Sequence, residues 1–278
     1  SAIFDLLCDT TVPAYRHGRL LLAQHVISLF RVDRAWTEEH VLPLFDWEVV
    51  PDEARLSWTG YLWSPRFYPS LLEAIRRQFL ETSKHYSELG KLADNHAGLL
   101  TFAAIEGEPF SEAEFRTATA ALPESGLVRA LTVLADGLRA AGDQRQEYWR
   151  NRVKPYWTRI WPKSRAIGTP AIAGAAATLA ISAGEAFQEA FSIIGVWLEA
   201  QPYPDHLLRQ LHEAGHCIKY PNEALAMIDV LVGPELSWVG EEFTNCLREI
   251  GTAAPEVTGD PRYLRLETMA RRHGSNMG

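Results

Sequence analysis

Apolar residues recur every three or four positions along most of the chain, which is the spacing that places them on one face of an α-helix. In residues 15–32 the apolar stripe consists of Leu20, Leu21, Ala23, Val26, Ile27 and Phe30. Strict alternation of apolar β-branched and polar residues, the pattern of a half-buried strand, never persists beyond a few positions. The sequence therefore predicts an all-α protein.

Proline, glycine, aspartate and serine interrupt this pattern at regular intervals, as at helix ends. Ser111 followed by Glu114 predicts a capping box, and Thr37 before two glutamates predicts an N-cap. The predicted helices span about 15–32, 37–45, 51–63, 70–82, 84–105, 127–141, 144–165, 171–183, 186–200, 204–216, 221–232, 237–250 and 260–272, and a further helix is predicted to begin at the capping box of Ser111. Short helices with short connections indicate stacked antiparallel hairpins, an irregular solenoid of the HEAT or armadillo kind. Because no strict repeat is visible, a compact orthogonal helical bundle is the alternative.

The stretch 144–165 holds the densest group of aromatic residues. At helical spacing one face carries Trp149, Val153, Tyr156, Trp157, Ile160 and Trp161. A stripe of this size predicts a buried face that anchors a core. Pro155 predicts a kink within this helix, and Pro162 predicts its end.

The same stretch carries most of the clustered positive charge. Residues 143–165 hold seven basic and two acidic side chains, a local excess of +5 in a chain of net charge −8. An acidic protein is the favoured partner of these basic side chains. Nucleic acid is the alternative, with Tyr148 as an exposed platform for base stacking. The predicted partner-binding residues are Arg145, Tyr148, Arg150, Arg152, Arg159, Lys163 and Arg165.

The sequence His212-Glu213-Ala214-Gly215-His216 matches the HExxH motif of zinc hydrolases, in which two histidines one helical turn apart bind zinc and the glutamate polarises a water. Glu235 stands at a spacing at which some zinc peptidases place a third ligand. Gly215 weakens the helix, and Tyr220-Pro221 stops it within about one turn of His216. We therefore expect no metal, cofactor or catalytic residue, and keep the zinc-dependent hydrolase as the alternative function.

Composition limits the cellular setting. The chain has 278 residues, 47% of them apolar, and three widely spaced cysteines, Cys8, Cys217 and Cys246. An odd number of cysteines without a CxxC pair favours reduced thiols in a cytoplasm. The most apolar run, 166–183, is rich in alanine and too weakly apolar for a membrane span. The chain opens without methionine, so we expect a single domain, 1–278, cut from a longer protein.

Three segments, 9–47, 53–74 and 147–173, resemble the helical C-terminal region of large bacterial proteins that carry sirtuin-like or related effector domains and act in defence against phage. The resemblance covers about residues 9–272 and brings no catalytic motif. It implies a non-catalytic interaction or sensing module of a larger intracellular bacterial protein. Its partners would then be the rest of its own polypeptide, a second copy of the chain, or a protein of the phage or host.

Overall fold

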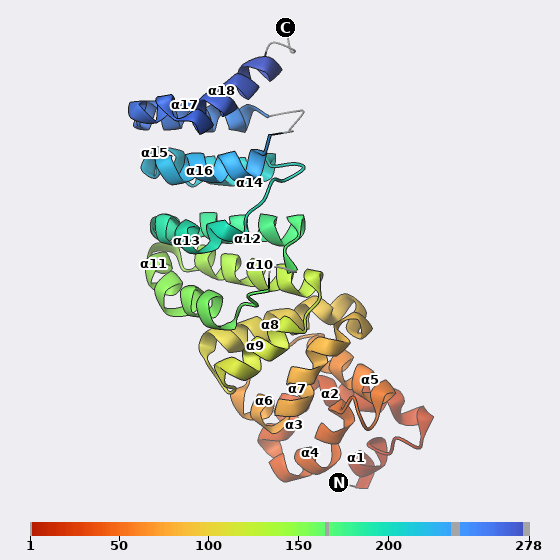
Figure 1. Ribbon diagram of the computed structural model, residues 1–278. Coiled ribbons are helices and arrows are strands. Elements are labelled where there is room, and N and C mark those ends of the chain that lie inside the picture. The colour runs from red at the N-terminus through yellow and green to blue at the C-terminus, as the bar shows by residue number, and fades with distance from the viewer. Residues whose placement is uncertain (1, 165–166, 235–239, 275–278) are drawn as a thin grey trace. The chain divides into compact units, whose positions relative to one another are not determined.

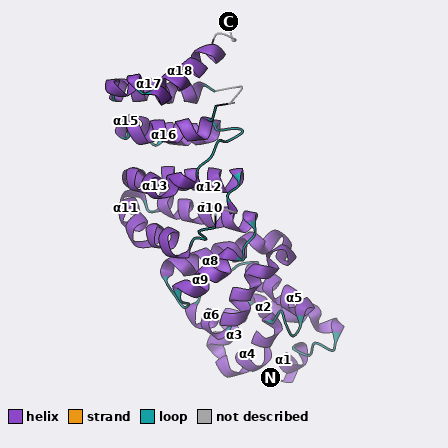
Figure 2. Ribbon diagram, viewed as in Figure 1, coloured by secondary structure: helices purple, strands orange, loops and turns teal. Residues whose placement is uncertain are grey.

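The computed structural model describes residues 2–164, 167–234 and 240–274. These ranges contain helices and their connections and no strand, so the prediction of an all-α protein is confirmed (Figure 2). Within the described residues no single helix is both long and apolar enough to cross a membrane.

The chain forms two compact units. Unit 1 comprises residues 1–130 and 155–163, and unit 2 comprises residues 131–154 and 164–278. The division between them falls inside the helix α10 (Glu124–Ala140) and again inside the central stretch 144–165. The sequence, which lacks any low-complexity linker, shows no sign of this division.

Unit 1 is built from α-helices, 3₁₀ segments and one π-helical segment, η6. In chain order they are α1 (Ala2–Leu7), η1 (Pro13–Tyr15), α2 (Arg16–Gln24), α3 (Val26–Val32), α4 (Arg34–His40), η2 (Leu42–Phe45), α5 (Pro51–Leu62), α6 (Pro69–Ala74), α7 (Arg76–Glu81), η3 (Thr82–Leu92), α8 (Ala93–Glu106), α9 (Glu112–Ala120), the start of α10, and η6 (Tyr156–Ile160). Aromatic side chains fill its centre, where Trp58 packs edge-on against Phe45 and Tyr61. Trp58 is completely buried, as the apolar spacing of α5 predicts.

Unit 2 consists of the end of α10 followed by successive helical layers (Figure 1). Its elements are η4 (Gly142–Gln144), α11 (Arg145–Tyr148), η5 (Trp149–Val153), α12 (Pro170–Ser182), η8 (Gly184–Ala186), α13 (Phe187–Ile194), η9 (Gly195–Trp197), α14 (Asp205–Glu213), α15 (His216–Lys219), α16 (Pro221–Val232), α17 (Glu241–Ala253), η10 (Pro255–Gly259) and α18 (Pro261–Gly274). Helices α12 and α13 pack together, α12 packs on α14, α14–α16 pack on α17, and α16 and α17 pack on α18. The alanine-rich helix α12 is largely buried because its small side chains let neighbouring helices approach closely.

Several predicted helix boundaries differ from the structure. The helix expected over 15–32 breaks at His25, whose backbone leaves helical geometry at φ −102° and ψ 14°. Helix α4 begins at Arg34 and not at Thr37, because Asp33 is the N-cap and its side chain accepts a hydrogen bond from the Trp36 backbone. The capping box at Ser111 and Glu114 is confirmed, with both reciprocal hydrogen bonds formed.

One histidine of unit 1 is buried in the aromatic core. His96 is fully buried between Phe79 and Trp58, and the Ser83 Oγ lies 3.2 Å from its Nε2. Its Nδ1 has no hydrogen-bond partner among the residues that the structure describes. Removal from water lowers the pKa of His96 to about 3, because the surroundings do not stabilise the imidazolium ion.

We expect unit 1 to lose stability steadily as the pH falls from about 6.5 toward 3. In that window the unfolded chain binds a proton at His96 that the native state excludes, so protonation favours unfolding. The loss at pH 5 is on the order of 2 kcal/mol. Urea unfolding at pH 7.5, 6.5, 5.5 and 5.0 measures it, with His96→Leu as the control. The same slope in the wild type and in His96→Leu would contradict this assignment.

Candidate functional site

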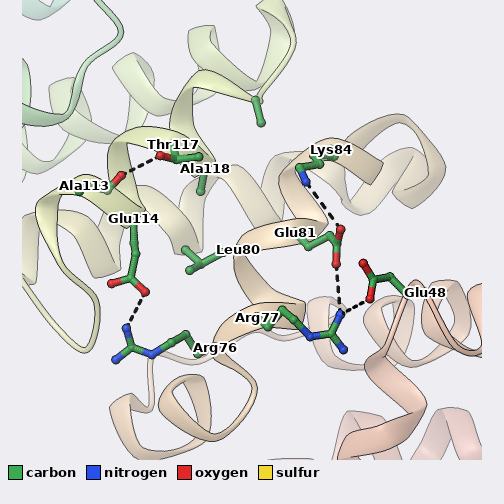
Figure 3. A pocket seen from close by; sticks show the side chains of 11 residues that line it. Glu48, Arg76, Arg77, Leu80, Glu81, Lys84, Ala113, Glu114, Thr117 and Ala118 are labelled. Carbon is green, nitrogen blue, oxygen red and sulfur yellow. Dashed lines mark hydrogen bonds and ion pairs between the residues drawn. The ribbon is translucent and has the colours of Figure 1, made fainter.

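A groove of about 570 Å³ lies along the seam between α7 and α9 in unit 1 (Figure 3). We call it the α7–α9 groove. The residues that line it are Glu48, Arg76, Arg77, Leu80, Glu81, Lys84, Ala113, Glu114, Thr117, Ala118 and Ala121. None of these is a histidine, cysteine or serine. The lining therefore offers surfaces for binding, but no histidine or cysteine to bind a metal and no serine or cysteine nucleophile.

The groove exists because α9 presents small side chains to it. Ala113, Thr117 and Ala121 recur every four positions and share one face of the helix, with Ala118 beside them. On the α7 side the floor is formed by the half-buried Leu80. Because alanine and threonine do not reach across to α7, the space above the seam stays open.

One end of the groove is closed by a cluster of charges around Arg76. Its guanidinium lies 2.6 Å from Glu114 and 2.8 Å from Glu73, and it also stands over the ring of Phe110 at 5.2 Å. Glu114 is held in the capping box at the start of α9. Hydrogen bonds from Ser111, and then from Arg76, lower the pKa of Glu114 to about 2. This carboxylate is therefore charged and fixed in position at neutral pH.

The opposite end carries a second network, centred on Arg77. Its guanidinium lies 2.9 Å from Glu48 and 3.5 Å from Glu81, and it also pairs with Asp46. Glu81 reaches Lys84 at 3.7 Å. The groove thus has an apolar floor between two ends where charges of both signs are already paired.

The aromatic face of the central stretch is buried, as predicted. Trp149, Trp157 and Trp161 are each exposed by 1% or less, and the rings of Trp157 and Trp161 stack with centroids 5.1 Å apart. In unit 1, η6 packs on α8 and α9. In unit 2, the Trp149 indole donates a hydrogen bond of 2.7 Å to Glu189. The aromatic face is therefore part of the core in both units.

The backbone of the central stretch adapts to Pro155 by widening its turns. Lys154 and Pro155 both keep helical geometry, with φ near −60°. The turns on either side, η5 and η6, are π-helical, and the kink expected at Pro155 stays a prediction. Trp161 then turns to extended backbone at ψ 132°, as the residue before Pro162 must. The predicted end of the helix is confirmed.

The predicted partner-binding residues are divided between the units. Arg145, Tyr148, Arg150 and Arg152 belong to unit 2, Arg159 and Lys163 belong to unit 1, and Arg165 lies outside the described residues.

Most of these predicted residues that the structure describes contact side chains or backbone of their own unit. Arg145 donates to the Leu138 carbonyl at 3.1 Å, Arg159 pairs with Glu112 at 2.8 Å, and Lys163 donates to the Trp157 carbonyl at 2.5 Å. Tyr148 is half-buried with its hydroxyl against Gly137, so it is not the exposed stacking platform that nucleic-acid binding would need.

The HEAGH motif does not form one helix. Helix α14 ends at Glu213, Gly215 adopts a left-handed conformation at φ 69°, and His216 begins α15. The His212 ring nitrogens lie 2.9 Å from Glu242 and 3.0 Å from Glu249.

His216 is buried and stacked on Phe187, with Nε2 2.8 Å from the Ile181 carbonyl. Among the described residues no three His, Cys, Asp or Glu side chains are grouped to hold a metal ion, and Glu235 lies outside those residues.

Sequence reasoning placed the candidate site on the central stretch and missed the α7–α9 groove. Arg76, Arg77 and the Ser111–Glu114 box were visible as features of separate helices. What joins them is the packing of α7 on α9, which no local pattern encodes. The small residues Ala113, Thr117 and Ala121, spaced four apart, were the one feature of the sequence that pointed to a groove beside this helix. No family model matches this sequence, and no curated protein or solved structure matches it either.

Proposed function

We propose that the protein is a non-catalytic helical interaction module, and that unit 1 binds an amphipathic helix of a protein partner in the α7–α9 groove. The observation that carries this proposal is the groove itself, with its apolar floor of small side chains and its ion-paired ends. A third helix laid on a seam between two packed helices buries its apolar stripe against both. Small residues on α9 allow the close approach that such packing needs.

The charged ends favour a helix whose apolar anchors are flanked by residues of both signs. Arg77, Glu48 and Lys84 are at least half exposed, so they can pair with such flanking residues at the rim. Exposed pairs of this kind contribute little to affinity and more to register and specificity. The floor around Leu80 and Ala118 would supply most of the binding free energy.

The wider setting of this proposal follows from the sequence resemblance. We place the module within a larger intracellular bacterial protein that acts in defence against phage, and its helix recognition would then detect a protein of the phage or host, or the rest of the same polypeptide. The successive layers of unit 2 support a solenoid-like arrangement of that unit over an orthogonal bundle. The exposed Arg150 remains a proposed contact for an acidic partner. No observation favours the hydrolase or nucleic-acid alternatives enough to propose them.

We expect Thr117→Arg to block the groove without disturbing the fold. Thr117 is exposed, its hydroxyl donates a hydrogen bond to the Ala113 carbonyl of its own helix, and arginine is a good helix former. The probe is a peptide selected on the wild-type protein from a library of helical peptides, each with leucine at positions i, i+3 or i+4, and i+7, and lysine and glutamate elsewhere. Its dissociation constant, measured by fluorescence anisotropy, should rise about tenfold or more, which corresponds to roughly 1.4 kcal/mol or more.

Thr252→Arg is the matched control, because Thr252 is also an exposed helical threonine whose hydroxyl bonds to the carbonyl four residues before it, here in unit 2. Peptide affinity should not change in this variant. A selected peptide that binds Thr117→Arg as tightly as the wild type would contradict the groove as the binding site. Failure to select any helical peptide would contradict this class of occupant.

A further inference from the structure

A second surface of unit 1 exposes a tryptophan beside an apolar hollow. Trp63, at the end of α5, is 70% exposed, and Leu21, on the facing helix α2, is 53% exposed. Between the two helices lies a hollow of about 320 Å³. We call this surface the α2–α5 patch. It consists of Leu20, Leu21, Gln24, Thr59, Gly60 and Trp63.

Gly60 lines the hollow at the point where α2 lies directly against α5. Helices α2 and α5 pack so closely that a Cβ atom on Gly60 would lie 2.5 Å from the Leu20 carbonyl oxygen, so no larger residue fits there. Leu20, Gln24 and Thr59 form the walls, and Trp63 forms one side while also projecting into solvent. The patch thus contains a large apolar projection next to a hollow that the described side chains of unit 1 leave open.

We propose that the α2–α5 patch is a self-association surface, on which a second copy of this chain docks so that the Trp63 of each copy fills the hollow of the other. A two-fold symmetric interface must be complementary to itself, and this patch contains both the projection and the cavity. Its six residues carry no charge, so two copies meet without opposing like charges at the centre. Gln24 can both donate and accept hydrogen bonds across the axis.

The size of the patch sets the strength of this association. A buried tryptophan covers about 150–250 Å², so two of them with the neighbouring leucines supply less than the roughly 1,200 Å² of a standard stable interface. We therefore expect a weak dimer that forms as the protein concentration rises. The α2–α5 patch shares no residue with the α7–α9 groove, so a variant in one surface does not test the other.

Sedimentation velocity over a concentration range of about 1 to 300 μM tests the proposal. The wild type should shift from monomer toward dimer, Trp63→Arg should stay monomeric at every concentration, and Gln24→Glu should weaken the dimer more at low salt than at high salt, because it places a charge in each copy of the patch. Tyr203→Arg is the control, since Tyr203 is an aromatic residue of unit 2 that is 87% exposed, and it should dimerise like the wild type.

Circular dichroism melting of each variant establishes that the fold is retained. A wild type that remains monomeric at 300 μM would overturn the proposal, and so would a dimer that survives both Trp63→Arg and Gln24→Glu. A dimer lost in Tyr203→Arg but kept in Trp63→Arg would place the interface on unit 2 and overturn it as well.

Discussion

Replacing Trp157 with alanine is expected to destabilise unit 1 by about 3–5 kcal/mol. The indole is 1% exposed and stacks nearly parallel to Trp161, with an angle of 8° between the ring planes. Truncation would remove this contact and leave a cavity between η6 and the helices α8 and α9, which cannot close without moving the backbone. Since small domains have a total stability of about 5–15 kcal/mol, the variant should lose a large part of it.

Urea unfolding followed by far-UV circular dichroism measures this effect, with Trp63→Ala as the matched control. Trp63 is 70% exposed in the same unit, so at protein concentrations low enough to keep the chain monomeric its truncation should cost less than about 1 kcal/mol. Equal losses in the two variants would show that burial of the Trp157 ring does not determine the stability of unit 1.

The helical nature of the fold was predictable because the period of the apolar residues is a local property. The capping box at Ser111 and the helix start at Pro69 were predictable for the same reason, since each involves residues within one turn. The breaks at His25 and Ile75 were not, because each backbone is non-helical within an otherwise continuous apolar pattern. There tertiary packing overrides local preference.

The candidate site was less predictable, since its residues are distant in the sequence. Arg76 meets Glu114 across 38 positions, and Arg77 meets Glu48 across 29. The charges of the central stretch also depend on contacts between residues that are distant in the sequence. Arg159 was predicted to bind a partner, and it is exposed, but it is already paired with Glu112, 47 positions away. The sequence shows where charges are dense but not which of them are already paired.

Replacing Arg19 with alanine is expected to cost about 3–5 kcal/mol, although arginine is usually a surface residue. Arg19 is fully buried between α2 and α5, where Nε and Nη2 donate hydrogen bonds of 2.7 and 2.8 Å to the two carboxylate oxygens of Glu53. Its Nη1 also donates to the Asp9 and Val12 carbonyls. The substitution leaves the mostly buried Glu53 carboxylate without its counter-ion, and each of the two carbonyls keeps only its backbone donor, Val12 N–H for Asp9 and Tyr15 N–H for Val12.

An exposed pair of the same chemistry provides the control for this prediction. Arg34 Nε lies 2.7 Å from Glu38, the same distance as in the buried pair, but the two side chains are 62% and 42% exposed. Arg34→Ala should therefore change the free energy of unfolding by no more than about 0.5–1 kcal/mol. If distance alone set the contribution of an ion pair, the two variants would lose the same stability.

The double variant Arg19→Met with Glu53→Leu separates the contribution of the ion pair from the cost of leaving the Glu53 carboxylate unpaired. Methionine and leucine fill similar volume without charge, so the double variant should be more stable than Arg19→Ala, because no unpaired carboxylate remains between α2 and α5. Urea unfolding of the wild type, Arg19→Ala and the double variant measures this order. A double variant that unfolds more easily than Arg19→Ala would show that the pair itself stabilises the seam, and not merely that its disruption is harmful.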